Sequence, residues 1–160
     1  MTRINTIDPS DLTNEWLLAE WRELPRIINE LEKHPNRYKP KDTPAQFTLN
    51  TGHVKFFRDK LLFLAKRHRL LKRELKKRNI KHDKKVRVEL HYLRDDLKMF
   101  CCNDWTPTTK DHDLLIERLQ ERFDLRKKPY HITKSNNKLV INCEHSFNEY
   151  CFKHLEKYYK

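Results

Sequence analysis

Three long segments of this chain carry apolar residues at helical spacing, and this pattern limits the fold more than any other feature of the sequence. The segments cover residues 10–34, 51–79 and 110–127. In each, the apolar side chains recur so that they line one face of a helix. Pro25 lies inside the first segment, and we expect it to kink or split that helix because proline lacks a backbone N–H. The sequence predicts a mainly α, compact single domain of three principal helices.

The two ends of the chain add smaller pieces to these helices. Residues 1–9 are expected to form an extended N-terminal arm. A small hairpin is predicted around Asn136-Asn137, and a short helix over residues 146–158 follows it. We expect residues 1–134 to form the main helical domain and residues 135–160 to form a C-terminal extension packed on it.

Residues 80–108 do not give one clear pattern. Val86 to Leu90 alternates like a strand, whereas Glu89 to Met99 also fits a short helix. Both interpretations stay open at this point.

The charge of the chain points to a polyanionic partner. The formal net charge is +12, and 36% of the residues are charged. The Lys- and Arg-rich segment 66–78 fits either a solvated helix face or a face that contacts phosphates. No apolar run approaches the ~18 residues of a membrane-spanning helix, and the first residues lack the apolar block of a signal peptide. We therefore expect no membrane association and a cytoplasmic location.

The sequence lacks the patterns expected for a nucleotide cofactor and for a metal site. The single glycine, Gly52, leaves no glycine-rich phosphate loop and no dinucleotide fingerprint, so no nucleotide cofactor is expected. Cys143 with His145 and Cys151 with His154 have the residue types of zinc ligands. Their spacing is unusually short, and free buried cysteine is common, so the sequence predicts no metal site.

The start of the chain offers a nucleophile. A small residue follows Met1, so Met1 should be removed, which would leave the α-amine of Thr2 as the chain end. A free α-amine has a pKa of about 7.7–8.0, and nearby arginines lower that value. The unprotonated amine can attack an electrophilic carbon and form an imine. Glu23 lies between Arg22 and Arg26, whose charges favour its ionised form.

These residues belong to a pattern that resembles the pyrimidine-dimer DNA glycosylases with abasic-site lyase activity of T-even phages and algal viruses. Three blocks in the same order carry the resemblance: the start Met1-Thr2-Arg3-Ile4-Asn5, the segment Ala19-Glu20 with Arg22-Glu23-Leu24-Pro25-Arg26, and Thr48-Leu49-Asn50-Thr51-Gly52-His53-Val54. The resemblance covers about 130 residues and implies a compact three-helix fold without a metal or nucleotide cofactor.

The resemblance also implies roles for individual residues. Thr2 would attack the anomeric carbon of the damaged nucleotide, and Glu23 would stabilise the developing charge and assist the later β-elimination. Phosphate and duplex contacts would come from a set of basic side chains: Arg3, Arg22, Arg26, Arg118 and Arg122. His53 is also assigned to the DNA-binding set, although a structural role at a helix start fits it somewhat better than a direct chemical one.

Two positions depart from the family pattern. Trp16 replaces the usual histidine, and Trp21 replaces a tyrosine or phenylalanine. Either indole could stack on bases of a kinked duplex, whereas packing of Trp16 into the helical core is the simpler alternative.

The leading hypothesis is a monomeric, bifunctional DNA repair glycosylase that excises ultraviolet-induced pyrimidine dimers from double-stranded DNA and then nicks the abasic site. One alternative is the same mechanism on another damaged or modified base. The other is a basic DNA-binding protein without catalysis. Removal of Met1 separates the catalytic hypotheses from the last one, because only they need the free amine.

Overall fold

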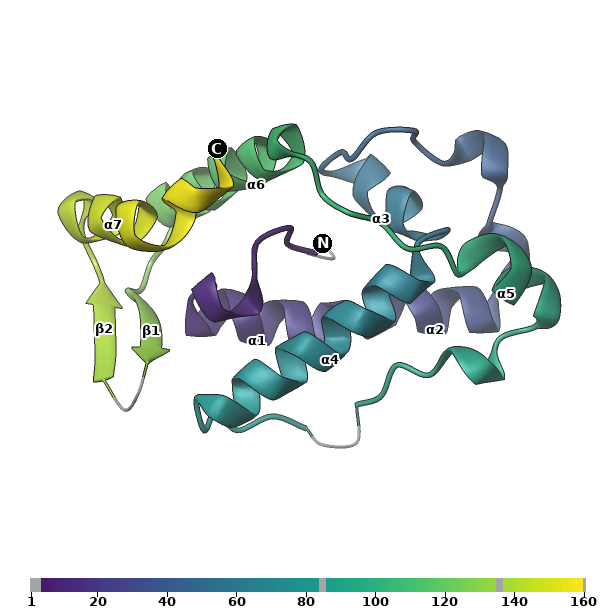
Figure 1. The fold of residues 1–160 in the computed structure, drawn as a ribbon, viewed down its shortest axis with the longest axis horizontal. Coiled ribbons are helices and arrows are strands. Elements are labelled where there is room, and N and C mark those ends of the chain that lie inside the picture. The colour runs from purple at the N-terminus through teal and green to yellow at the C-terminus, as the bar shows by residue number, and fades with distance from the viewer. Residues whose placement is uncertain (1–3, 84–85, 135–136, 160) are drawn as a thin grey trace.

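The computed structural model of the protein describes residues 4–83, 86–134 and 137–159. The longer helices are α1 (Asn14–Glu23), α2 (Pro25–Lys33), α4 (Leu61–Lys77) and α6 (Thr109–Asp124). The shorter elements are α3 (Thr51–Phe57), α5 (Asp95–Cys101), α7 (Glu144–Tyr150) and the strands β1 (Tyr130–Lys134) and β2 (Asn137–Ile141). Helix α4 packs against α1, and the N-terminal arm lies between α1 and α6 (Figure 1). The mainly α fold is confirmed.

The first predicted helix begins later than expected and is split where expected. Asp8 caps only a single turn of 3-10 helix. The hydroxyl of Thr13 then accepts a hydrogen bond from the backbone N–H of Trp16 at 3.3 Å, and this cap begins α1. Pro25 occupies the first position of α2, where a missing N–H leaves no hydrogen bond unmade. The chain therefore forms two consecutive helices in place of one.

The second predicted helix, over residues 51–79, is wrong as a single element, because a break at residues 58–60 divides it into α3 and α4. Lys60 has a non-helical backbone and forms an antiparallel bridge with Cys102. The carbonyl of Asp59 accepts hydrogen bonds from the backbone and the side-chain amide of Asn103, at 3.3 Å and 2.8 Å. These long-range contacts replace helical hydrogen bonds, so tertiary structure overrides the local pattern.

Gly52 fixes the close approach between α3 and the loop before it. A Cβ atom built on Gly52 would lie 2.5 Å from the Cγ2 methyl group of Thr48. Threonine has little freedom to rotate away, so a larger residue at position 52 would push the loop of residues 48–50 outwards. This loop forms part of the pocket described below.

The region between α4 and α6 contains one regular helix, α5, and no strand among its described residues. Val86 to Leu90 makes no ladder within the described part of the chain, so the strand interpretation is wrong. The alternative helix over residues 89–99 is only partly right, because Leu90–Tyr92 forms a single turn and α5 begins later, at Asp95.

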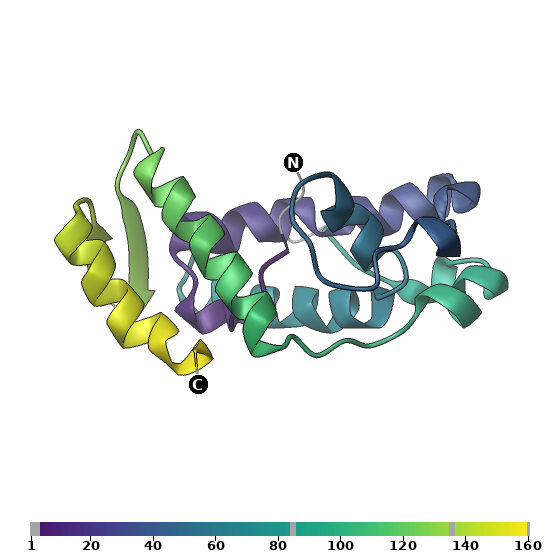
Figure 2. The same ribbon diagram turned by 90° about the horizontal axis from the view of Figure 1, so that it is seen from above.

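The C-terminal end of the chain forms the predicted hairpin and helix. Strands β1 and β2 pair in register from Tyr130 opposite Ile141 to Lys134 opposite Asn137. Helix α7 and two further short helical turns then run to Tyr158. Figure 2 shows this hairpin and α7 together at one end of the molecule. The division at residues 134 and 135 stays a prediction, and it would fall inside the hairpin.

Asp11 joins the C-terminal segment to the N-terminal region through several contacts. Its carboxylate accepts a hydrogen bond from the hydroxyl of Tyr158 at 2.9 Å and pairs with Lys157 at 2.6 Å and with His154 at 3.3 Å. The hydroxyl of Tyr150 donates to the Asp11 carbonyl at 2.5 Å. Burial on its own would raise the pKa of Asp11, but these hydrogen bonds and the Lys157 charge outweigh it and lower the pKa to about 2.

Candidate DNA-binding and catalytic site

A buried ion pair holds the N-terminal arm in place. Glu20 is fully buried on α1, and Arg67 on α4 is 5% exposed. The Arg67 guanidinium donates two hydrogen bonds to the Glu20 carboxylate, at 2.8 Å and 3.0 Å. The same carboxylate accepts hydrogen bonds from the backbone and the side-chain amide of Asn5, at 3.1 Å and 2.7 Å. A third Arg67 hydrogen bond, of 2.7 Å, goes to the Ile7 carbonyl. Two positions of the arm are therefore tied to one buried charge pair.

His53 fixes a third position of the arm. Its Nε2 accepts a hydrogen bond from the backbone N–H of Ile4 at 3.0 Å, so Nδ1 carries the proton and donates to the Thr48 carbonyl at 3.0 Å. Burial lowers the pKa of His53 and favours this neutral form. The predicted residue thus positions the arm, and both of its ring nitrogens are occupied. Thr2 and Arg3 come directly before Ile4 and lie outside the described residues.

Arg78 anchors the start of the chain in a similar way. It is 7% exposed, pairs with Glu74 at 2.8 Å, and donates to the backbone carbonyls of Leu12, Pro9 and Ser10. The hypothesis that the whole segment 66–78 forms a phosphate-binding face is therefore wrong for Arg67 and Arg78. Both guanidiniums are buried and donate to internal acceptors, which makes them structural.

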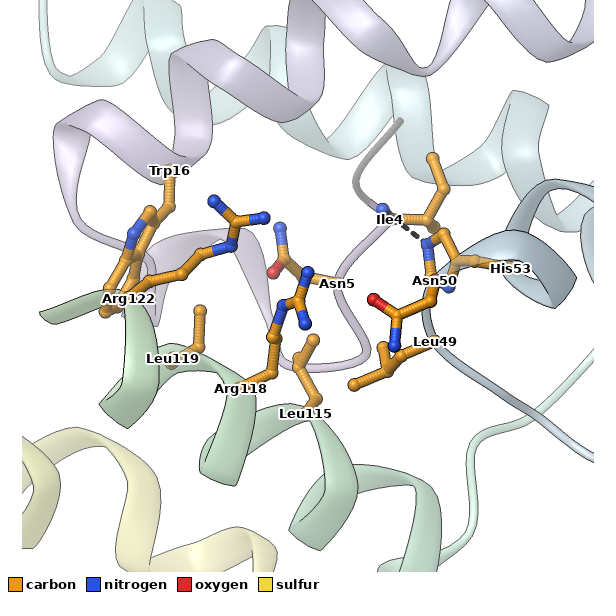
Figure 3. Close-up of a pocket in the computed structure, with 10 residues that line it drawn as sticks. All are labelled: Ile4, Asn5, Trp16, Leu49, Asn50, His53, Leu115, Arg118, Leu119 and Arg122. Carbon is orange, nitrogen blue, oxygen red and sulfur yellow. Dashed lines mark hydrogen bonds between the residues drawn. The ribbon is translucent and has the colours of Figure 1, made fainter. Parts of the chain in front are cut away.

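A pocket lies between the arm, α1, α3 and α6 (Figure 3). Its lining combines apolar walls with polar and cationic groups: Ile4, Asn5, Trp16, Leu49, Asn50, His53, Leu115, Arg118, Leu119 and Arg122. Arg118 and Arg122 lie one turn apart on α6 and extend towards the pocket in Figure 3. The Arg118 guanidinium is also 3.6 Å from Glu121. The structure thus brings together Trp16, His53 and both α6 arginines from segments far apart in sequence.

The other predicted charged residues lie at the junction of α1 and α2, outside the lining of this pocket. Arg22 and Arg26 are exposed, so both can contact a large anion. Glu23 is the last residue of α1, and its Oε2 is buried without a hydrogen-bond partner among the described residues. Leaving a buried carboxylate oxygen unpaired costs about 1–3 kcal/mol or more. A reacting group or a water that binds this oxygen would remove that cost.

The two unusual tryptophans occupy different environments. Trp21 is 1% exposed and stacks on His68, with ring centroids 4.1 Å apart. That burial gives no support to the predicted DNA contact, because the ring is covered inside the core. Trp16 is 3% exposed and packs on Tyr130 and Tyr150, yet it also lines the pocket. Trp16 therefore packs in the core and also lines the pocket, so each of the two interpretations is partly right.

Sequence reasoning missed four residues of the site: Asn5, Glu20, Asn50 and Arg67. Glu20 and Arg67 had a detectable signal, because each occupies an apolar face of its helix. Glu20 follows Leu17 and precedes Leu24 at helical spacing, and Arg67 stands between Leu64 and Leu71. A charged residue on such a face needs a buried partner of opposite charge. Two such residues on two helices therefore predict a pair.

Metal ligands do not gather in the described part of the chain. No group of three or more His, Cys, Asp or Glu side chains forms a possible metal site among those residues. Cys143 is exposed, and Cys101, Cys102, Cys143 and Cys151 are all free thiols. In the same residues, no helix combines the length and apolar character needed to cross a bilayer.

The family model described as pyrimidine dimer DNA glycosylase matches residues 1–88, more than half of the chain. This basic helical protein is therefore a DNA repair glycosylase. It belongs to the family of pyrimidine dimer DNA glycosylases. The matched region includes the arm, α1, α2, α3 and α4, and it ends before α6.

Proposed function

We propose that this protein excises pyrimidine dimers through an imine with the Thr2 α-amine and then nicks the resulting abasic site. Membership of the family supports base excision on damaged DNA. The proposal adds the nucleophile, the lyase step and the roles of individual residues. It requires removal of Met1, so that Thr2 carries the free amine.

The proposed reaction has two chemical stages. The Thr2 amine attacks C1′ of the damaged nucleotide, the bond from C1′ to the base breaks, and the electron pair of that bond leaves with the base, which takes up a proton. Opening of the sugar ring then gives the imine. In the second stage a proton leaves C2′, the bond from C3′ to oxygen breaks, and the 3′ phosphate departs. Water finally releases Thr2 from the imine.

Glu23 is suited to assist both stages. A carboxylate near the sugar stabilises the positive charge that develops as the base departs, and the same group can help to remove the C2′ proton. Its buried Oε2, without a partner among the described residues, supports this assignment. The assignment needs the sugar to approach the end of α1 at which Glu23 lies.

The single observation that best supports the nucleophile is the anchoring of the arm. Ile4, Asn5 and Ile7 are held by His53, by Glu20 and by Arg67. A buried ion pair contributes little net stability compared with apolar packing, so its value here lies in position. Together with His53, it fixes the backbone from two residues after Thr2 onwards, beside a pocket with two arginines.

The pocket suits a nucleotide that has left the duplex. Enzymes that act on a base remove it from the stack, and a damaged pair lowers the cost of doing so. Leu49, Leu115 and Leu119 offer apolar walls, and Arg118 and Arg122 offer charges for phosphates. The exposed Arg22 and Arg26 extend the cationic surface along the duplex.

Ultraviolet-irradiated supercoiled plasmid gives the direct test, because one assay reports excision and nicking together. We expect nicking of irradiated plasmid only, and borohydride should trap the protein covalently on DNA with an abasic site. Edman sequencing of the trapped adduct should be blocked at Thr2. Thr2→Ser keeps a small second residue and is the matched control, whereas Thr2→Leu should retain Met1 and lose trapping.

Three results would contradict the proposal. Equal nicking of irradiated and unirradiated plasmid would remove the pyrimidine-dimer substrate. Trapping through a lysine would remove the α-amine as nucleophile. Tight DNA binding with neither nicking nor trapping would favour the non-catalytic alternative.

A further inference from the structure

Asn50 has an unusual backbone at the edge of the pocket. Its φ is 61° and its ψ is −130°, a region that only glycine adopts without strain. The chain contains another asparagine with positive φ, Asn79, at φ 54° beyond the end of α4. Asn79 does not line the pocket, whereas Asn50 does.

The side chain of Asn50 is available for a ligand. Figure 3 shows its carboxamide at the pocket, close to Leu49 and His53. It is exposed and makes no hydrogen bond with any other described residue. The backbone carbonyl of Asn50 accepts a hydrogen bond from the His53 N–H at 3.2 Å, whereas its side chain gains no hydrogen bond from the strained conformation. The side chain is therefore a candidate for function, because strain persists where a site needs it.

The other polar groups of the pocket cannot supply the same chemistry. Both ring nitrogens of His53 are occupied, and the Asn5 amide donates to Glu20. Arg118 and Arg122 are donors only. The Asn50 carboxamide places an N–H donor beside a carbonyl acceptor, the pattern that binds a base edge through two parallel hydrogen bonds.

We propose that Asn50 binds the edge of an unstacked base in this pocket and helps to select the substrate. The inference rests on the proposed function, since it needs a nucleotide that leaves the duplex. Leu49 and the α6 leucines would cover the faces of that base, and Asn50 would bind its edge. The base comes either from the lesion or from the opposite strand, and the experiment separates these sources.

The key variant is Asn50→Gly, which removes both the strain and the carboxamide. We expect its thermal midpoint to rise by about 2–6 °C, while kcat/KM for dimer excision falls about 5–100-fold. Asn50→Asp keeps the size of the side chain and replaces its donor with a charge, so it should lose excision as well. Asn79→Gly is the matched control and should leave excision unchanged.

Three duplexes identify the contact: a thymine dimer opposite adenines, the same dimer opposite two baseless residues, and an abasic site opposite adenine. On the first duplex, Asn50→Gly should show the defect, a kcat/KM below that of the wild type. If it disappears on the second, the bound base is in the opposite strand. If it disappears on the third, the bound base belongs to the lesion.

The outcomes also separate this inference from the function on which it rests. A wild-type protein that does not cleave the first duplex overturns both. A wild-type protein that cleaves it, with an equal defect of Asn50→Gly on all three duplexes, overturns the base contact alone, since Asn50 would then act on the sugar-phosphate backbone. An Asn50→Gly variant with wild-type kinetics also overturns the inference.

Discussion

The two sides of the pocket are held by different physical means. One side, which we name the arm wall, consists of Ile4, Asn5 and His53, and directional hydrogen bonds to a buried ion pair and an imidazole position it. The other, the α6 wall, consists of Leu115, Arg118, Leu119 and Arg122. This helix begins at a capping box at Thr108 and is positioned mainly by packing of Phe123 on Phe147, with ring centroids 4.1 Å apart, and by one hydrogen bond of 2.8 Å between His112 and the Thr6 hydroxyl of the arm.

This difference suggests that the arm wall positions the nucleophile and that the α6 wall contacts phosphates. Hydrogen bonds to buried charges fix atoms more narrowly than apolar packing does, and a nucleophile needs such positioning. Phosphate contacts tolerate more variation, because they act at longer range. The family match includes the arm wall and stops before the α6 wall. Variants of each wall test whether the two walls differ in this way.

Glu20→Ala should have the largest effect, because it leaves the Arg67 guanidinium buried without its partner. We expect a loss of about 3–5 kcal/mol in the free energy of unfolding, measured by urea denaturation. The double variant Glu20→Ala with Arg67→Met should recover much of that stability and still lack borohydride trapping. Normal trapping by the double variant would show that the arm wall does not need this anchor.

Glu23→Gln should keep the fold and DNA binding but lose about 10²–10³-fold in the rate of base excision. The amide has the shape of the carboxylate and lacks its charge, so stabilisation of the transition state is lost. Single-turnover kinetics and fluorescence anisotropy measure the two properties separately. Excision near the wild-type rate would exclude Glu23 from the chemistry.

His68 should make the core beside the arm wall sensitive to mild acid. Burial lowers the pKa of His68 to about 4, with a smaller contribution from Lys72. The unfolded chain binds this proton at higher pH, so stability is full above pH 6.5 and falls on acidification from there to about 4, by roughly 3 kcal/mol at most. His68→Leu should flatten this part of the pH profile. An unchanged profile would contradict the assignment.

Asp11 should make the stability of the folded protein depend on pH in a more acidic range, through its contacts with the C-terminal segment. Its pKa is about 2 in the folded protein, so its stabilisation is present above pH 3.8 and is lost as the pH falls to about 2. The shift corresponds to about 2 kcal/mol. Asp11→Asn should show this deficit at neutral pH and approach the wild type near pH 2. A constant deficit at every pH would mean that the charge is not responsible.

The smallest effect concerns the salt dependence of DNA affinity. Each arginine that neutralises a phosphate contributes about 0.9 to the slope of log affinity against log salt concentration. Arg118→Gln and Arg122→Gln should each reduce the slope by that amount. Lys128→Gln, at an exposed position beyond α6, is the control. An unchanged slope in both arginine variants would remove the α6 wall from the DNA interface.

The sequence predicted the parts of this fold that depend on local pattern. The helical stripes, the split at Pro25 and the two paired strands of the hairpin follow from residue spacing and from the chemistry of proline. The predicted turn residue Asn136 lies outside the described residues. The break between α3 and α4 could not be found in this way, because it depends on Lys60 meeting Cys102, more than 40 residues away.

The candidate site was predictable to a similar degree. The resemblance to a family indicated His53 and the α6 arginines, which the structure brings to one pocket. The net basic charge of segment 66–78 concealed the internal roles of Arg67 and Arg78, since exposed and buried arginines look alike in sequence. The backbone of Asn50 has no local signature beyond the tolerance of asparagine for positive φ.

The anchored arm sets the local concentration of the proposed nucleophile. Thr2 is two residues before Ile4, and consecutive Cα atoms are 3.8 Å apart, so the covalent tether confines the Thr2 Cα to within about 7 Å of Ile4. One amine in a sphere of that radius corresponds to an effective concentration on the order of 1 M. Every nucleotide that enters the pocket beside Ile4 would meet the amine at that local concentration, whatever the amount of protein in solution.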